Sequence, residues 1–175
     1  MIEPPLVAAS YDTPFGTLRV LLTPEDGTVR SSGFRPLRDS VAALPAGLQA
    51  RGWVEGDQPD VAAAIGAWLD GDGDAITAIP AAQEGGPFFQ ELWAQLRTVP
   101  SGTSVSYQEL AEMAGRPRAM RAAGTACARN NLAPFVPCHR VVKSGGRLGS
   151  YGYGGESMKA GMLVLEGERP ARTGG

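Results

Sequence analysis

The sequence predicts an α+β protein in which a strand-rich N-terminal part precedes a helical C-terminal part that carries a reactive cysteine. Short β-type segments dominate the first third of the 175-residue chain, whereas helical periodicity begins after Gly85-Gly86. The only histidine, His139, directly follows Cys138, one of two cysteines. We therefore predict two domains, an N-terminal one of residues 1–85 and a C-terminal one of residues 86–175.

The composition excludes several classes of protein. Hydrophobic residues make up 43% of the chain and charged residues 19%, which suits a packed core. The sequence contains no 18-residue apolar window and no secretory signal pattern, so we expect no membrane span and a cytoplasmic location. Two cysteines suit a reducing compartment. Two cysteines and one histidine cannot complete a structural zinc site, so no metal is expected.

The charge is divided unevenly along the chain. Residues 1–86 carry five basic and twelve acidic side chains, a net charge of −7, whereas residues 87–175 carry eleven and six, a net charge of +5. A basic C-terminal half is consistent with an anionic partner. The alternative is ordinary surface charge that happens to be unevenly placed.

Three strands and one helix are predicted in the N-terminal part. The strands cover residues 6–12, 16–23 and 27–34, with Pro14-Phe15-Gly16 as a turn between the first two. Residues 36–58 are rich in glycine, proline and alanine and predict a loop. A helix follows over residues 59–71, because apolar residues recur at helical spacing: Val61, Ile65, Trp68 and Leu69. The acidic segment after this helix, DGDGDA, lacks the downstream glutamate of a calcium loop, so a linker is expected.

Three helices are predicted in the C-terminal part. The first covers residues 87–100 and presents one apolar face made of Phe89, Leu92, Trp93 and Leu96. The second starts at Ser106, which forms an S-x-x-E capping box with Glu109, and stops at Gly115. The third has Pro117 at its first position. Two short helices joined by a glycine-containing turn are typical of a helix-turn-helix.

The third predicted helix combines arginines with small residues. Small side chains let a helix approach a groove closely, and arginines bind phosphates, so this pattern is consistent with DNA binding. An amphipathic helix with inward alanines and solvated arginines is an equally good interpretation of the same pattern. Cys127 lies on this helix and is expected to be a small buried residue rather than a redox site.

The Cys138-His139 pair is the chemical centre of the sequence. Adjacent side chains of an extended segment point to opposite sides, so we expect a bridging water or a local bend between them. An imidazole that accepts a proton is usually oriented by a carboxylate, and Glu166 is one candidate. A cysteine protease is disfavoured, because its histidine comes from a distant segment. A buried cysteine beside a hydrogen-bonded structural histidine is the alternative that an isolated dipeptide would favour.

Three segments, "SYQELAEMAGRPRAMRAAGTACARNN", "PCHRVV" and "YGYGGESMKAGMLVLEG", together resemble the O6-alkylguanine-DNA alkyltransferase family, also called methylated-DNA–protein-cysteine methyltransferases. The resemblance runs from about Pro87 to about Glu168. It implies a ribonuclease-H-like N-terminal domain and a winged-helix-like C-terminal domain with a helix-turn-helix. It also implies direct repair of O6-alkylguanine, with O4-alkylthymine as a further expected substrate. The alkyl group would pass irreversibly to Cys138 after base flipping, once per molecule and without a cofactor.

The resemblance assigns five catalytic residues. Cys138 would be the nucleophile, His139 would accept its proton through a water, and Glu166 would orient the imidazole. Tyr107 would donate a hydrogen bond to the guanine ring as the base leaves. Asn130 would be the hinge between the third predicted helix and the "PCHR" segment, holding two backbone segments together with its amide.

The expected partner is double-stranded DNA that contains alkylated bases and is bound through its minor groove. Arg121 would enter the base stack and fill the space left by the flipped nucleotide. The other expected DNA-binding residues are Arg118, Ala119, Ala122, Ala123 and Arg129. The alkylguanine pocket would be formed by Tyr107, Val141, Tyr151 and Gly152. We expect a monomer, and whether it assembles cooperatively on DNA stays open.

The chain departs from the family pattern in the segment after Tyr151. Between Tyr151 and Lys159 it is one residue longer than most relatives, and Gly161 stands where the family usually has a large residue. Asn131 replaces a common proline. A non-catalytic lesion binder on the same scaffold is the rival function, disfavoured because Cys138 is present.

Overall fold

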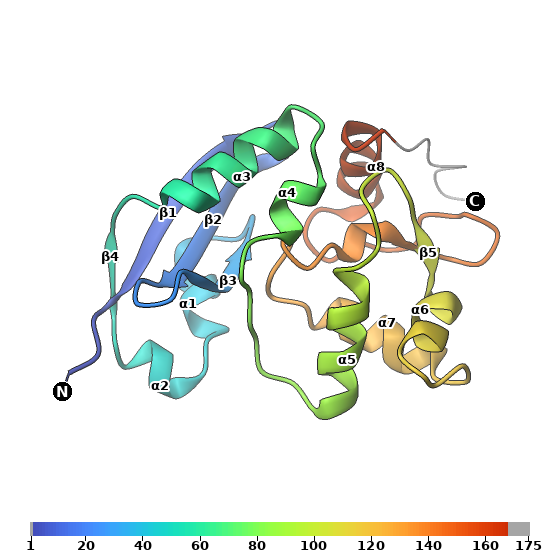
Figure 1. Ribbon diagram of the computed structural model, residues 1–175, viewed down its shortest axis with the longest axis horizontal. Helices are drawn as coiled ribbons and strands as arrows, with labels where there is room; N and C mark the ends of the chain where they lie inside the picture. Colours follow the sequence, from blue (N-terminus) through green and yellow to red (C-terminus); the bar gives the residue numbers. More distant parts are fainter. Residues whose placement is uncertain (1, 168–175) are drawn as a thin grey trace.

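The computed structural model describes residues 2–167 and places a four-stranded sheet beside a group of helices (Figure 1). The strand order is β3-β2-β1-β4, antiparallel throughout except for the parallel β1–β4 pair. The strands are β1 (Leu6–Thr13), β2 (Gly16–Thr23), β3 (Thr28–Gly33) and β4 (Trp53–Glu55). The three predicted strands and the tight turn between the first two are thus confirmed. The fold is mixed α+β, as predicted.

The loop predicted over residues 36–58 is a correction. This segment contains two short helices and the edge strand β4; the helices are α1 (Leu37–Ala42) and α2 (Ala46–Gln49). A proline immediately precedes each helix, Pro36 before α1 and Pro45 before α2. Helices this short complete too few turns to show a periodic apolar pattern, so sequence periodicity could not reveal them.

Helix α3 (Pro59–Leu69) covers the sheet and ends near the second half of the molecule (Figure 1). Its buried residues Val61, Ile65 and Trp68 join strand residues in one core, which confirms the predicted apolar face. The acidic segment that follows leads into the short helix α4 (Asp74–Thr77).

The C-terminal half is built from helices around a two-stranded parallel sheet. The helices are α5 (Pro87–Leu96), α6 (Tyr107–Met113), α7 (Met120–Ala128) and α8 (Gly155–Leu165). The strands are β5 (Val105–Ser106) and β6 (Val141–Val142). The capping box is confirmed, because the Glu109 backbone N–H donates to Ser106 Oγ at 3.0 Å and the Ser106 N–H donates to Glu109 Oε1 at 3.1 Å.

The start of the third predicted helix is a second correction. Gly115, with a φ of 85°, ends α6, and the chain then makes a turn in which the Ala119 N–H donates to the Arg116 carbonyl. Helix α7 therefore starts at Met120 rather than at Pro117. Residues 117–119, which the sequence assigned to the first turn of the helix, instead form the turn between α6 and α7.

The two halves share one hydrophobic core. A single cluster of buried side chains includes Val20 and Ile65 from the first half and Leu110 and Met162 from the second. The backbone N–H of Ser32 on β3 also donates to the Asn131 carbonyl at 2.9 Å. No helix within residues 2–167 combines the length and the apolar character that crossing a bilayer requires.

Candidate active site

A cavity of about 210 Å³ opens where α6, α7 and the loop before α8 meet. Cys138 lies in its wall, and only 5% of the surface of this residue is exposed. The lining residues are Tyr107, Gly124, Cys127, Ala128, Cys138, Ser150, Tyr151 and Gly152. Thiols, those of Cys127 and Cys138, are the strongest nucleophiles among these lining residues. The cavity can therefore hold a small electrophile next to a cysteine sulfur.

Cys138 begins a 3-10 turn that continues through Arg140. The chain is therefore bent at these residues rather than extended, which agrees with the local bend that was one of the two expected alternatives. The turn is anchored by Asn130, whose amide donates to Cys138 Sγ at 3.3 Å and to the Val136 carbonyl at 2.8 Å. The side-chain oxygen Oδ1 of Asn130 accepts from the Leu132 N–H at 3.0 Å. One side chain thus joins the end of α7 to the segment that carries the thiol.

His139 is fully buried and paired with Glu166, with Nε2 lying 2.9 Å from Oε1. Glu166 is ionised and can only accept, so Nε2 carries the proton of the neutral imidazole. Nδ1 is then the basic nitrogen. It is buried and has no hydrogen-bond partner among the described residues, so it is available to accept a proton.

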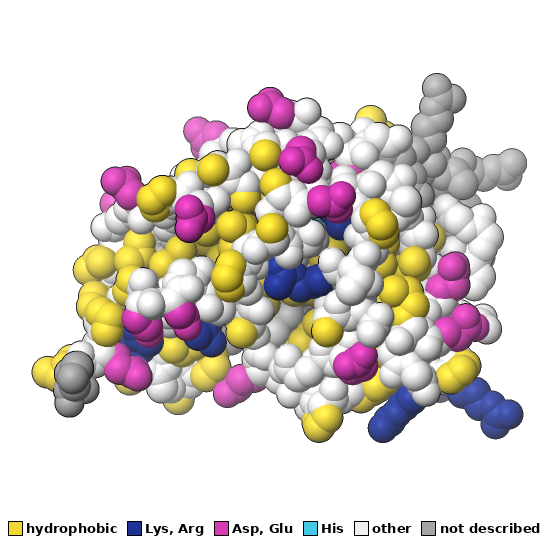
Figure 2. Space-filling view, viewed as in Figure 1, with side chains coloured by type: hydrophobic (Ala, Val, Ile, Leu, Met, Phe, Trp, Pro, Cys, Tyr) yellow, Lys and Arg dark blue, Asp and Glu magenta, His cyan; other side chains and the backbone are white. Residues whose placement is uncertain are grey.

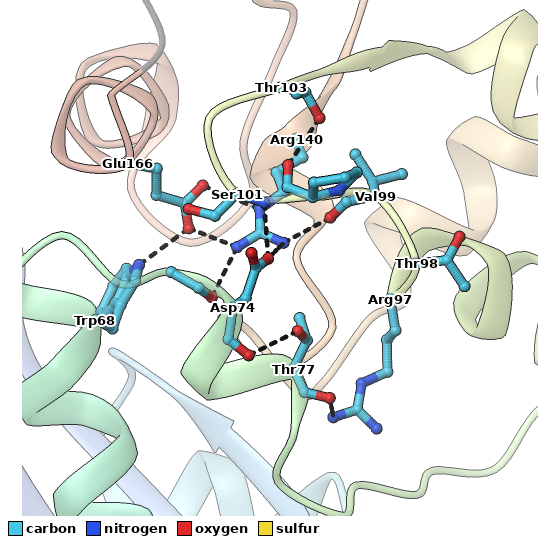
Figure 3. Close-up of polar contacts among 12 residues, drawn as sticks. Trp68, Asp74, Thr77, Arg97, Thr98, Val99, Ser101, Thr103, Arg140 and Glu166 are labelled. Atoms are coloured by element: carbon cyan, nitrogen blue, oxygen red, sulfur yellow. Dashed lines mark hydrogen bonds and ion pairs between the residues drawn. The ribbon is translucent and has the colours of Figure 1, made fainter.

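Glu166 is the C-terminal cap residue of α8, and its carboxylate receives four hydrogen bonds. Figure 3 shows Trp68 and Arg140 on this carboxylate. Arg140 donates to both oxygens, from Nε to Oε1 at 3.0 Å and from Nη2 to Oε2 at 2.7 Å. The Trp68 indole N–H donates to Oε2 at 3.0 Å. Burial alone would raise the pKa of Glu166, but the hydrogen bonds from His139 and Arg140 lower it to about 2. The carboxylate therefore keeps its charge at neutral pH.

The thiol and the imidazole both rest in their neutral forms. Burial raises the pKa of the Cys138 thiol, although the Asn130 amide and the Lys159 ammonium oppose this. Burial lowers the pKa of His139, although its hydrogen bond to Glu166 opposes this. A neutral thiol beside a neutral base with a free Nδ1 is the starting arrangement for proton transfer on demand, rather than a permanent thiolate.

The sequence and the fold match known proteins. Residues 87–168 match the family model for the DNA-binding domain of 6-O-methylguanine DNA methyltransferase. The methylated-DNA–protein-cysteine methyltransferase of Mus musculus is 39% identical over 150 residues, which cover 78% of this chain and 68% of that protein. The chain belongs to the methylated-DNA–protein-cysteine methyltransferase family. This confirms the resemblance that the three sequence segments indicated.

Further similarity is found with a longer relative and with two solved structures of one protein. The bifunctional transcriptional activator/DNA repair enzyme Ada of Escherichia coli is 46% identical over 99 residues, which cover 57% of this chain but 28% of Ada. The crystal structure of the O6-methylguanine methyltransferase of Mycobacterium tuberculosis has a TM-score of 0.72 and 27% identity, covering 95% of this chain and 96% of that one. A structure of that protein in complex with DNA has a TM-score of 0.71 over 91% of this chain and 92% of that one, also at 27% identity.

Three of the four predicted pocket residues line the reactive cavity. Tyr107 and Tyr151 face the cavity, and burial raises the pKa of both hydroxyls. The Tyr151 hydroxyl donates to Met162 Sδ at 3.5 Å. Gly152 also lines the cavity, whereas Val141 is fully buried in β6 and is not part of the lining. Cys127 is partly exposed and lines the cavity, so the expectation that it is simply buried is wrong.

A second cavity, of about 470 Å³, adjoins the first and shares Tyr107, Gly124 and Ser150 with it. Arg121 lies in its wall, on the first turn of α7. Two cations that the sequence reasoning missed, Lys143 and Arg147, lie in the same wall. The reactive cavity therefore opens onto a wider vestibule with basic walls.

The predicted DNA-binding residues divide by exposure. Arg118, Arg121 and Arg129 are exposed, and basic side chains project at the lower right of Figure 2, over the α6–α7 region of Figure 1. Ala119 and Ala122 are partly exposed. Ala123 is fully buried in the core, so its assignment to a DNA contact is wrong, because that side of α7 packs inward.

Three buried residues of the site were missed from the sequence. Arg140 and Trp68 hold Glu166, and Lys159 is fully buried with Nζ 5.8 Å from the centroid of the Tyr107 ring. Arg140 could have been suspected, because a charged residue stands inside the apolar run "APFVPCHRVV". Trp68 carries no such signal, since it fits the apolar face of α3.

Proposed function

We propose that this protein repairs DNA by transferring the alkyl group of O6-alkylguanine to Cys138, once per molecule, with O4-alkylthymine as a further substrate. Family membership supports the reaction class. The observation that carries the residue assignment is the buried arrangement of Cys138 with Asn130 and of His139 with Glu166 and Arg140, beside a cavity that Cys138 lines. The reaction balances with the thiol and the alkylated base alone, so it needs no cofactor.

The chemical step is an in-line displacement at the alkyl carbon. The Cys138 proton passes through a bridging water to His139 Nδ1, and Glu166 stabilises the resulting imidazolium. The bond from Sγ to carbon forms as the bond from carbon to O6 breaks, and the electron pair of that bond passes to the guanine. A proton then returns to the guanine ring. The net change places the alkyl group on sulfur as a stable thioether and leaves normal guanine.

Tyr107 and the loop around Tyr151 would bind the flipped base. The Tyr107 hydroxyl stays protonated at neutral pH, because burial raises its pKa, so it can donate a hydrogen bond to the guanine ring as charge develops there. Gly152 and the backbone of Cys138, which both line the cavity, would face the polar edge of the base. The cavity of about 210 Å³ is smaller than the usual ligand site of about 300–1,000 Å³, so it favours one small, flat group over a bulky one.

The DNA would be bound through its minor groove by α6 and α7, acting as a helix-turn-helix. Arg121 would enter the base stack from the first turn of α7 while the target base occupies the cavity that shares its vestibule. Arg118 and Arg129 would bind phosphates, and the partly exposed Ala119 and Ala122 would allow close approach.

The finer structural assignments belong to the same proposal. We propose a ribonuclease-H-like N-terminal domain within residues 1–85 and a winged-helix-like C-terminal domain within residues 86–175. Of these, residues 1 and 168–175 lie outside the described residues. We further propose a cytoplasmic monomer that can assemble cooperatively on DNA.

The test is a mass measurement on the full chain. The protein is incubated with duplex DNA containing O6-methylguanine, and intact and peptide masses are recorded. We expect one added methyl group per molecule, on the peptide that contains Cys138, and no transfer by Cys138→Ser with DNA binding retained. DNA binding without any transfer by the parent protein would instead support the lesion-binder alternative. Transfer to Cys127 would overturn the assignment of the nucleophile.

A further inference from the structure

The carboxylate of the proton relay is held partly by the other half of the molecule. Trp68 lies in the last turn of α3 and is fully buried, and its indole N–H donates to Glu166 Oε2 at 3.0 Å. These two residues are 98 positions apart in the sequence. Figure 3 shows Trp68 and Arg140 approaching the carboxylate from different segments. The N-terminal half therefore contacts the relay directly rather than only covering it.

An aromatic contact fixes Trp68 against the helix that carries Glu166. The Phe15 ring, from the turn between β1 and β2, lies 5.8 Å from the Trp68 ring at an interplanar angle of 42°. Phe15 also fills the space beside Gly161 on α8, where an added Cβ would lie only 2.9 Å from its Cε1 atom. The absence of a side chain at Gly161 is thus matched by an aromatic ring of the N-terminal half.

The four donors to Glu166 are divided equally between its two oxygens. Oε1 accepts from His139 Nε2 and Arg140 Nε, and Oε2 accepts from Arg140 Nη2 and Trp68 Nε1. Without the indole donor, Oε2 would keep a single partner. A buried carboxylate oxygen that loses a donor can rotate toward other partners, and the hydrogen bond on Oε1 that orients the imidazole would then be less well fixed.

A second contact from the N-terminal half supports the same geometry. Arg140 Nη2 also donates to the Gly73 carbonyl at 3.0 Å. A Cβ at Gly73 would lie 2.0 Å from Ser101 Oγ and 2.8 Å from Glu166 Oε2. The backbone at Gly73 thus closes over the ion pair, and the acidic segment predicted as a linker contributes a wall of this buried site.

We propose that Trp68 is a positioning residue for alkyl transfer, because its indole N–H fixes the Glu166 carboxylate that orients His139. This inference rests on the proposed function. It assigns part of the N-terminal half to the proton relay. Trp68 lines neither the reactive cavity nor the adjoining one, so its effect should appear in the rate of transfer and not in the affinity for DNA.

The test compares Trp68→Phe with Trp93→Phe in the full chain. Trp93 is a matched control, because it is also buried and its indole N–H also donates a 3.0 Å hydrogen bond, in this case to the Ala126 carbonyl. Single-turnover transfer from duplex DNA containing O6-methylguanine is measured over a range of DNA concentrations. We expect Trp68→Phe to lower the saturating rate constant about tenfold, the usual scale for one hydrogen bond to a charged group, with an unchanged half-saturating DNA concentration. Trp93→Phe should transfer at a rate close to that of the parent.

A double-mutant cycle with Glu166→Gln separates positioning from general destabilisation. If Trp68 acts through the carboxylate, Trp68→Phe should cost little further rate in the Glu166→Gln background. Equal slowing in both backgrounds, or an unchanged rate for Trp68→Phe, would overturn the inference. Neither result would affect the proposed function as long as the parent protein transfers the methyl group, whereas an inactive, folded parent would refute the proposed function itself.

Discussion

The reactive site and the exposed arginines of α7 place charge in opposite environments. At the reactive site, His139, Arg140 and Lys159 are fully buried, and the pair formed by Arg140 and Glu166 has no exposed side-chain surface. On α7 and the turn before it, the arginines are exposed. The reactive site therefore has buried charges, whereas α7 has solvent-exposed charges.

This difference has a physical cause. A buried charge loses its hydration and is stable only when specific partners replace the water, so every donor around Glu166 has a fixed position. An exposed arginine keeps its hydration and can move to meet a phosphate, so its position is loosely determined. Substitutions in the reactive site should therefore affect folding and chemistry, whereas those on α7 should affect DNA binding and base opening.

The largest effect on stability is expected for Arg140→Met. Removing the guanidinium leaves Glu166 buried with only the His139 and Trp68 donors, and breaking a buried ion pair in this way costs about 3–5 kcal/mol. Urea unfolding followed by tryptophan fluorescence measures the loss. Arg118→Met is the control, because Arg118 is exposed, and its midpoint should stay close to that of the parent. Similar midpoints for the two variants would contradict the contrast between the two regions.

The next largest effect is expected on the rate of transfer in Glu166→Gln. A neutral amide stabilises the imidazolium less than a carboxylate does, so proton transfer from Cys138 becomes less favourable and the rate should fall about 100-fold. The apparent pKa of the thiol should rise, which moves the alkaline limb of the rate–pH profile to higher pH. Single-turnover rates between pH 5 and 10 would show this shift. A profile identical to that of the parent would remove Glu166 from the relay.

The same profile has an acid limb in the parent protein. Burial lowers the pKa of His139, so the imidazole is neutral at pH 7 and transfer should be lost only as the pH falls below the ordinary histidine value of about 6.5. Glu166, with a pKa of about 2, stays ionised throughout this range. Loss of activity already at pH 7 to 8 would show that His139 is charged at rest, which is incompatible with its role as the base.

The sequence predicted the parts of this molecule whose causes are local. The capping box at Ser106 depends on residues three positions apart, and the hairpin depends on a two-residue turn, so both could be found from short patterns. The chemistry of the residues made Cys138, His139 and Glu166 candidates, and the family resemblance assigned their roles. Trp68 was assigned only to the core, because its bond to Glu166 depends on packing between segments 98 positions apart. Strand β4 has only three residues and is defined by its pairing with β1.

A smaller and selective effect is expected for Arg121→Ala. If Arg121 replaces the flipped base in the stack, its loss should slow repair of duplex DNA about tenfold, because opening the duplex costs a few kcal/mol that the arginine helps to offset. Reaction with free O6-methylguanine base needs no opening and should keep its rate. The two rates are compared for variant and parent by peptide mass. Equal slowing with both substrates would assign Arg121 to the cavity instead of to the base stack.

The smallest effect is expected for Arg129→Ala. Arg129 is exposed near the end of α7, and its guanidinium carbon lies 5.8 Å from the centroid of the Phe89 ring, a contact that leaves it able to reach a phosphate. Its loss should weaken binding to damaged and undamaged duplex alike and reduce the slope of log K against log salt by about 1. The saturating transfer rate should not change, because the buried relay is untouched. A lowered saturating rate would mean that the surface and the reactive site are coupled through α7, and the separation between the two regions would then fail.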